Sequence, residues 1–407
     1  MDTPDIRACE EVVPASEGPT SSAALRAIAP LSGSACADTL VSPAPPSAPR
    51  LLVVGCGGIG GVIAATLVEQ GQRLTVVTRR AAITEAIRLR GFDLRDELGQ
   101  RRIRGEVELV EELPVEGSWD FVFLAVPPTG LVEAARGAAP LLAKGGALVC
   151  FQNGLAEERL ARIVGPERVI GAVVAWGASS PDPGVFERTS AGGFTLGRLD
   201  GEVGEQLESL GRILEAIGPV ELSTNLRGAR WSKLALNCAV SSLGTIGGDR
   251  LGVLMRHRFV RRLALEVMTE AVVVARAEGV RLEKVAGTLD LEWVALTDAE
   301  RSGAGSPSVM AKHALLLAVG ARYRRLRSSM LAAIERGREP PVDYLNGEVV
   351  DRAMRHGIGA PLNARIRELV HAIARREERS EVSTLRRLYD ETRYPGANAA
   401  QKSPPPA

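Results

Sequence analysis

A polar stripe along an otherwise apolar segment is the first feature of the sequence that could do chemistry. In RGARWSKLALNCAVSS, Lys233, Asn237 and Ser241 are spaced by four residues, so they lie on roughly one face of a helix. The apolar neighbours of the lysine predict that its ammonium is partly desolvated and that its pKa is lowered toward neutrality. Such a lysine can protonate a developing alkoxide, and Asn237 could hold a substrate oxygen beside it. The pattern also fits a lysine that extends into solvent at a domain edge.

A glycine-rich loop is the second such feature. In LLVVGCGGIG, a G-x-G-x-x-G spacing directly follows an apolar strand and opens an apolar helix. We expect Gly55 to allow a tight turn, Gly57 to let a pyrophosphate approach the backbone, and Gly60 to let the helix pack closely on the strand. The free N–H groups at the helix start would bind the same phosphates. The predicted dinucleotide-binding residues are Gly55, Cys56, Gly57, Gly58, Ile59 and Gly60.

The end of the second strand indicates which dinucleotide is bound. An NAD site usually has an acidic residue there for the ribose 2′-hydroxyl, but RLTVVT is followed by Arg79 and Arg80, and the next acid is Glu85. Two guanidinium groups suit a 2′-phosphate because each can make bidentate contacts. The sequence therefore predicts NADPH, and the alternative is a solvated pair of arginines at a helix start.

These groups must be positioned by two kinds of structure. The first half alternates apolar strands with helices, which predicts parallel βαβ units with right-handed crossovers. Strands are expected at 51–55, 73–78, 119–126 and 146–151, a helix at 59–70, and further strands of the same sheet near 167–175, 184–189 and 193–198. The second half predicts helices at 226–256, 258–280, 306–336, 342–357 and 361–390.

The fold class expected is therefore α/β, a Rossmann-type doubly wound sheet followed by an all-α domain. The predicted divisions are a disordered leader at 1–48, an NADP-binding domain at 49–224, a helical substrate and catalytic domain at 225–392, and a disordered tail at 393–407.

The composition excludes several classes of protein. The chain has 407 residues, 45% of them hydrophobic, with a net charge of +1, so no overall basic field favours nucleic acid or an anionic membrane. Five widely spaced cysteines and four histidines have no metal-ligand spacing, which predicts reduced thiols and no metal. The chain has no apolar run near the roughly 18 residues of a membrane span, and no signal peptide. A cytoplasmic protein is expected.

Five segments resemble the ketopantoate reductase family in type and order. They are GCGGIG, FQNG at 151–154, RWSKLALNC, and SSML followed by VDYLNG at 328–331 and 342–347. The resemblance covers about residues 50–392. It implies a Rossmann domain and a helical domain with the active site between them. It also implies NADPH-dependent reduction of 2-dehydropantoate to D-pantoate, a step toward pantothenate and coenzyme A.

The resemblance also implies residue roles. Lys233 matches the family's general acid, Arg79 its 2′-phosphate arginine, and Asn153 an asparagine beside both cofactor and substrate. The substrate-binding positions are matched by Asn153, Asn237, Ser329 and Ser241, the last where a second asparagine is common.

Two departures from the family's usual residues predict that the groups around the substrate are changed. Pro127 stands where the family usually has a lysine, and Pro341 where it has a glutamate, with Glu339 two residues earlier. The alternatives are therefore a reductase of a different small 2-oxo acid and a non-catalytic NADP-binding sensor. An opine- or polyol-type dehydrogenase would need a histidine or a different lysine motif. The expected partner is a small 2-oxo acid, and the helical half is a candidate surface for a homodimer.

Overall fold

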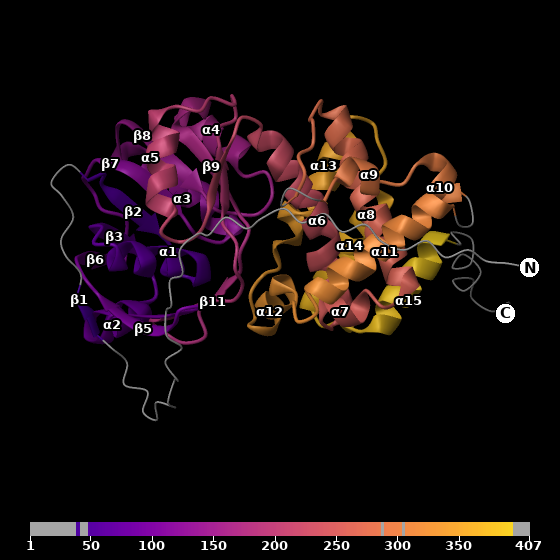
Figure 1. The fold of residues 1–407 in the computed structure, drawn as a ribbon, viewed down its shortest axis with the longest axis horizontal. Coiled ribbons are helices and arrows are strands. Elements are labelled where there is room, and N and C mark those ends of the chain that lie inside the picture. Colours follow the sequence, from indigo (N-terminus) through magenta and orange to yellow (C-terminus); the bar gives the residue numbers. More distant parts are fainter. Residues whose placement is uncertain (1–37, 41–47, 286–288, 303–305, 394–407) are drawn as a thin grey trace, which may run out of the picture. The chain divides into compact units, whose positions relative to one another are not determined.

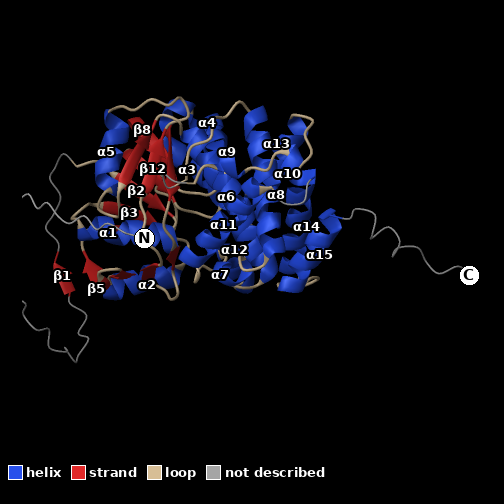
Figure 2. Ribbon diagram, turned by 45° about the vertical axis from the view of Figure 1, so that its right-hand side comes forward, coloured by secondary structure: helices blue, strands red, loops and turns tan. Residues whose placement is uncertain are grey.

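A computed structural model describes residues 38–40, 48–285, 289–302 and 306–393. Strands occupy the first part of the described chain and long helices the second (Figures 1 and 2), as the sequence predicted. Apart from residues 38–40, 48 and 393, the predicted leader and tail lie outside the described residues. The fold is therefore an α/β Rossmann-like half followed by a helical half.

The main sheet has eight strands. Their spatial order is β13 (Val220–Ser223), β12 (Phe194–Gly197), β9 (Val169–Val174), β8 (Leu142–Cys150), β7 (Trp119–Leu124), β2 (Leu51–Val54), β3 (Leu74–Val77) and β6 (Val107–Val110). β2 lies between β3 and β7 and runs parallel to both, which confirms the predicted βαβ arrangement. Because both faces of the sheet are covered, β2 and β3 are buried at every position.

One predicted strand belongs to another sheet. β11 (Val185–Arg188) does not extend the main sheet as expected from 184–189, but pairs with β4 (Phe92–Asp96) in a second sheet. The physical reason is aromatic packing, because the Phe186 ring lies against Gly61 and against Phe92 at 5.9 Å between centroids. The order of this sheet is β1 (Asp38–Leu40), β5 (Gly99–Arg104), β4, β11 and β10 (Ala178–Ser179).

The α/β half has five α-helices within the described residues. They are α1 (Gly58–Glu69), α2 (Ala81–Arg90), α3 (Leu131–Ala138), α4 (Glu157–Val164) and α5 (Glu205–Leu214), with 3-10 turns η1 (Pro128–Gly130), η2 (Ala139–Leu141) and η3 (Pro166–Arg168). α1 is buried continuously from Gly60 to Val68, since it packs between the two sheets. Its first turn is thereby fixed beside the end of β2.

The helices of the second half are shorter than predicted. The expected helix at 226–256 ends at Gly247, because Gly248 adopts a left-handed conformation with φ of +71°. The expected helix at 306–336 is two helices, the second capped by the Ser328 hydroxyl, and 361–390 is divided after Ala374. The elements are α6 (Leu226–Gly247), α7 (Leu251–Leu254), α8 (Arg258–Ala277), α9 (Leu291–Val294), α10 (Asp298–Ser302), α11 (Pro307–Arg322), α12 (Ser329–Glu335), η4 (Pro341–Tyr344), α13 (Asn346–Arg355), α14 (Pro361–Ala374) and α15 (Val382–Arg393).

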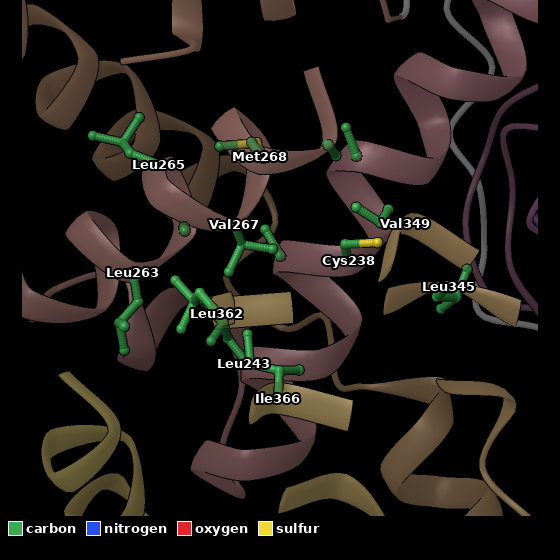
Figure 3. Close-up of a cluster of buried hydrophobic side chains, with 14 of the residues drawn as sticks. Cys238, Leu243, Leu263, Leu265, Val267, Met268, Leu345, Val349, Leu362 and Ile366 are labelled. Carbon is green, nitrogen blue, oxygen red and sulfur yellow. The ribbon is translucent and has the colours of Figure 1, made fainter. Parts of the chain in front are cut away.

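An apolar core holds α6 in place. Cys238 and Leu243 of α6 pack with Val267 and Met268 of α8 and with Leu362 of α14 (Figure 3). This core also excludes water from one side of α6, so the opposite side of the helix is left to face the α/β half.

A buried polar chain runs through the same core. The Ser242 hydroxyl donates to Asn346, the Asn346 amide donates to Asn363, and the Asn363 amide donates to Glu270 at 2.7 Å. Burial raises the pKa of Glu270, although hydrogen bonds from Asn363 and Leu362 oppose that effect. Asn346, the asparagine of VDYLNG, therefore fixes α13 against α6 inside the core.

Candidate active site

Each glycine of the glycine loop has a distinct structural role. Gly55 has φ of +102°, which side chains rarely adopt, and its N–H donates to the Val77 carbonyl at 2.9 Å. A Cβ at Gly60 would lie 1.9 Å from the Gly55 carbonyl oxygen, so only glycine lets α1 approach the loop this closely. A Cβ at Gly57 would meet nothing within 4 Å. The backbone thus faces open space at Gly57, where a pyrophosphate is predicted to bind.

The two residues beside Gly57 are constrained from within the protein. A Cβ at Gly58 would lie 2.8 Å from the Ala178 carbonyl oxygen of β10. The Cys56 side chain is buried, and burial raises its pKa to about 12, although the nearby Arg80 opposes this. Cys56 therefore holds a protonated, inert thiol that fills the loop.

The arginines after β3 differ in what they contact. The Arg80 guanidinium donates to the Cys56 carbonyl at 3.3 Å, which brings it to the glycine loop. Arg79 is exposed and forms no ion pair with any described residue. Both are accessible, and the 2′-phosphate role of Arg79 stays a prediction.

A cavity of about 200 Å³ opens beside the glycine loop. Four of the predicted site residues line it: Ile59, Asn153, Ser241 and Ser329. The remaining walls are Ala125, Val126, Pro128, Phe151, Gln152, Met330, Pro341, Tyr344 and Leu345. None of these lining residues is charged, so any ligand charge held here must be bound by neutral donors.

Lys233 has the lowered pKa that its apolar neighbours predicted. It is partly buried on α6, two helical turns before Ser241, and its Nζ donates to the Val174 carbonyl at the end of β9. Burial lowers its pKa to about 7, the positive charge of Arg230 adds to that effect, and Glu157 opposes it. The side chain can therefore hold or release a proton near neutral pH.

Arg230 and Glu157 form a buried ion pair that sequence reasoning missed. The Arg230 guanidinium also donates to the carbonyls of Gln152 at 2.8 Å and Cys150 at 2.9 Å. These bonds tie α6 to the FQNG turn and so position Asn153. The available signal was that Arg230 stands one helical turn before Lys233, on the same side of the helix.

Gln152 is a second positioning residue in that turn. Its amide donates to the carbonyls of Leu124 at 2.9 Å and Val126 at 2.8 Å, at the end of β7. The FQNG turn is therefore fixed to the neighbouring strand end, and its asparagine is left exposed at the cavity.

Ser328 places its neighbour Ser329 at the cavity. The Ser328 hydroxyl donates to the Ser241 carbonyl at 2.8 Å, pairs with the Thr245 hydroxyl at 2.8 Å, and accepts from the Leu331 N–H. Because these contacts fix the start of α12 against α6, the Ser241 and Ser329 side chains share one wall.

Not all of the other predicted site positions line the cavity. Lys233 and Asn237 are both partly buried, and neither is among the cavity-lining residues. Pro341 lines the cavity, whereas Pro127 precedes η1 and its neighbour Pro128 forms the wall. Glu339 is exposed and is not part of the wall, so it does not replace a glutamate there.

The described residues offer neither a metal site nor a membrane-spanning helix. They contain no group of three or more His, Cys, Asp or Glu side chains that could hold a metal ion. Within the same residues, no helix combines the length and apolar character needed to cross a membrane.

The chain matches two models of one family. The family model described as "Ketopantoate reductase PanE/ApbA" matches residues 51–201, and the model described as "Ketopantoate reductase PanE/ApbA C terminal" matches residues 225–374. The 2-dehydropantoate 2-reductase of Pyrococcus abyssi is 24% identical over 316 residues, which cover 77% of this chain and 94% of that protein.

Solved structures share the fold. The PanE/ApbA family ketopantoate reductase from Ralstonia eutropha JMP134 is 26% identical with a TM-score of 0.66, covering 81% of this chain and 99% of its own. D-mandelate dehydrogenase, solved with NADH and anilino(oxo)acetate, is 18% identical with a TM-score of 0.67, covering 80% and 99%. At that identity the second likeness shows the fold alone. Taken with the glycine loop, the FQNG turn and the α6 lysine, these matches show that the chain is an oxidoreductase belonging to the ketopantoate reductase family.

Proposed function

We propose that this protein uses NADPH to reduce a 2-oxo acid, with 2-dehydropantoate to D-pantoate as the first candidate reaction. The observation that carries the proposal is Lys233, whose pKa of about 7 suits a proton donor on the helix that also lines the cavity. The names of relatives such as the Pyrococcus abyssi enzyme support the substrate. In this proposal residues 49–224 bind the cofactor and residues 225–392 supply the catalytic helix.

The residues present fit a dinucleotide. Open space in front of Gly57 and the free N–H groups at the start of α1 suit a pyrophosphate. Arg79 and Arg80 suit a 2′-phosphate, which supports NADPH over NADH. When bound, the nicotinamide supplies the hydride that reduces C2 of the substrate.

The protein's own part is to hold the substrate and supply a proton. Lys233 in its protonated form donates a proton to the C2 oxygen as negative charge develops there. The nearby charge of Arg230 favours release of that proton, and the Val174 carbonyl orients the ammonium. Ser329, Ser241 and Asn153 are the neutral donors available to the substrate's carboxylate and carbonyl oxygens.

A second candidate is reduction of a different 2-oxo acid. The uncharged cavity favours this second candidate. Pro341 stands in its wall where the family resemblance implies a glutamate, so a charged side chain is absent there. D-mandelate dehydrogenase, which shares the fold, was solved with anilino(oxo)acetate, so this architecture accommodates an aromatic oxo-acid ligand.

Steady-state NADPH oxidation tests the proposal. Purified protein would receive 2-dehydropantoate and then a panel of small 2-oxo acids, with NADH as the cofactor control. Turnover of 2-dehydropantoate would support the first candidate. Turnover of another 2-oxo acid alone would support the second, and NADPH binding without any turnover would favour a non-catalytic sensor and contradict the proposal.

A further inference from the structure

Two pairs of exposed arginines, one in each half of the protein, are here called the arginine rim. Arg79 and Arg80 follow β3 in the α/β half, whereas Arg336 and Arg338 follow α12 in the helical half. All four are exposed, and none forms an ion pair with a carboxylate of the described residues. By contrast, the exposed Arg327 is paired with Glu335. The arginine rim therefore has unused capacity to bind an anion.

The cavity brings the two halves of the rim toward one another. Ser329 and Met330, at the start of α12, line the cavity together with Ile59 of the glycine loop. Pro341, which follows the segment bearing Arg336 and Arg338, lines it too. That segment thus joins two positions in the wall that faces the loop. On the opposite side, the Arg80 guanidinium is held at the loop by its hydrogen bond to the Cys56 carbonyl.

The charges of the two halves affect each other. The pKa of Arg338 is lowered by partial burial, and then by the positive charges of Arg336 and Arg80. Glu339, the next residue in the chain, forms no ion pair with Arg338 in the described structure. Like charges gathered without a counter-charge repel one another, and an anion bound between them removes the repulsion.

We propose that Arg338 of the helical half joins Arg80 of the α/β half in binding the 2′-phosphate of NADPH. This deepens the proposed function and rests on its choice of cofactor. A phosphate offers three acceptor oxygens, and a planar guanidinium on each side can make charge-assisted hydrogen bonds to them. The helical half then contributes to cofactor choice as well as to the substrate wall.

Binding measurements on the full chain test this assignment. We would compare wild type, Arg338→Gln and the control Arg379→Gln, which removes an exposed arginine from the segment between α14 and α15 that forms no ion pair with the described residues. The ligands are NADPH, NADH, 2′,5′-ADP and ADP, with binding followed by calorimetry or nicotinamide fluorescence. Thermal melting of each variant confirms folding. Arg338→Gln should raise the Kd for NADPH and 2′,5′-ADP about tenfold or more.

The pattern across ligands decides the outcome. The assignment requires NADH and ADP to bind Arg338→Gln as they bind wild type, and all four ligands to bind Arg379→Gln normally. An unchanged NADPH Kd in Arg338→Gln overturns the assignment while leaving NADPH as the cofactor. Equal losses for NADPH and NADH also overturn it, since they would place Arg338 near the shared pyrophosphate. A wild type that does not prefer NADPH over NADH overturns both this assignment and the proposed cofactor.

Discussion

The glycine loop and the wall that the helical half gives to the cavity are built on different principles. The glycine loop of the α/β half, here called the backbone wall, lies beside the cavity and is formed by main chain: it is turned by Gly55, open at Gly57 and packed through Gly60. The wall from the helical half presents side chains such as Ser241, Ser329 and Tyr344, which come from three separate elements. A backbone site is encoded in one short stretch of sequence, whereas a side-chain site depends on distant segments meeting correctly.

Ionic contacts join the two halves. Arg230 of α6 pairs with Glu157 of α4, and Arg352 of α13 contacts Glu158 of α4 at 2.7 Å and Glu278 at 2.9 Å. Both arginines are buried, so each contact carries a desolvation cost that only a correctly placed partner offsets. The comparison predicts large effects where a variant separates the walls, and smaller effects where it alters one wall.

The largest effect is expected for Arg230→Met. This change leaves the Glu157 carboxylate buried without its cation, which should lower the free energy of unfolding by about 3–5 kcal/mol. Urea unfolding measures the loss. The control is Arg327→Met, whose ion pair with Glu335 is exposed and should cost less than about 1 kcal/mol. Equal losses in the two variants would contradict the claim that Arg230 joins the walls.

The next largest effect is expected for Lys233→Ala. Removing the proton donor should slow 2-oxo-acid reduction by about a hundredfold or more, while the Kd for NADPH stays unchanged. Stopped-flow kinetics and cofactor titration separate the two quantities. Lys144→Ala, which removes an exposed lysine from β8, is the control and should leave both unchanged. Near-normal turnover in Lys233→Ala would remove this residue from the mechanism.

Two glycine variants sharpen the account of the backbone wall. Gly60→Ala places a Cβ 1.9 Å from the Gly55 carbonyl oxygen, and should lower the free energy of unfolding by about 1–3 kcal/mol. Gly57→Ala meets no protein atom within 4 Å, so stability should be retained while the Kd for NADPH rises. Calorimetric melting and cofactor titration distinguish the two. A destabilised Gly57→Ala protein with normal cofactor affinity would be inconsistent with the proposed pyrophosphate site.

The smallest effects are expected for two adjacent serines of the side-chain wall. Ser329→Ala should raise the KM for the 2-oxo acid about tenfold, the share of one hydrogen bond to a charged group, without changing stability. Ser328→Ala removes the cap of α12 and should lower the free energy of unfolding by about 1 kcal/mol. If Ser329→Ala left the KM unchanged, Ser329 would not be a substrate ligand.

The sequence predicted the backbone wall well because that wall is local. The order of strand, glycine loop, helix and second strand within about 30 residues was enough to place α1 beside β2. The same periodicity could not assign β11 to its sheet, because that depends on Phe186 meeting Gly61 and Phe92. β4 and β5 were not predicted, since charged residues interrupt the apolar alternation of FDLRDELGQRRIR.

The sequence predicted residues of the side-chain wall, but it did not predict the contacts that hold them in position. The α6 spacing and the family resemblance identified Ser241, and the resemblance identified Ser329. Neither indicated that the Ser328 hydroxyl connects the two through the Ser241 carbonyl. Arg230 was missed because a buried ion pair with Glu157 joins residues more than 70 positions apart. Such non-local contacts become visible only in the folded chain.

The most direct test of the account is the pH dependence of hydride transfer, measured in single turnovers so that product release does not set the rate. A proton donor acts in its protonated form, and the pKa of Lys233 is lowered to about 7. The rate of 2-oxo-acid reduction should therefore be highest below that pKa and fall about tenfold per pH unit above it. The apparent pKa of this fall should be near 7. A rate that stays constant from about pH 6 to 9 would contradict Lys233 as the general acid.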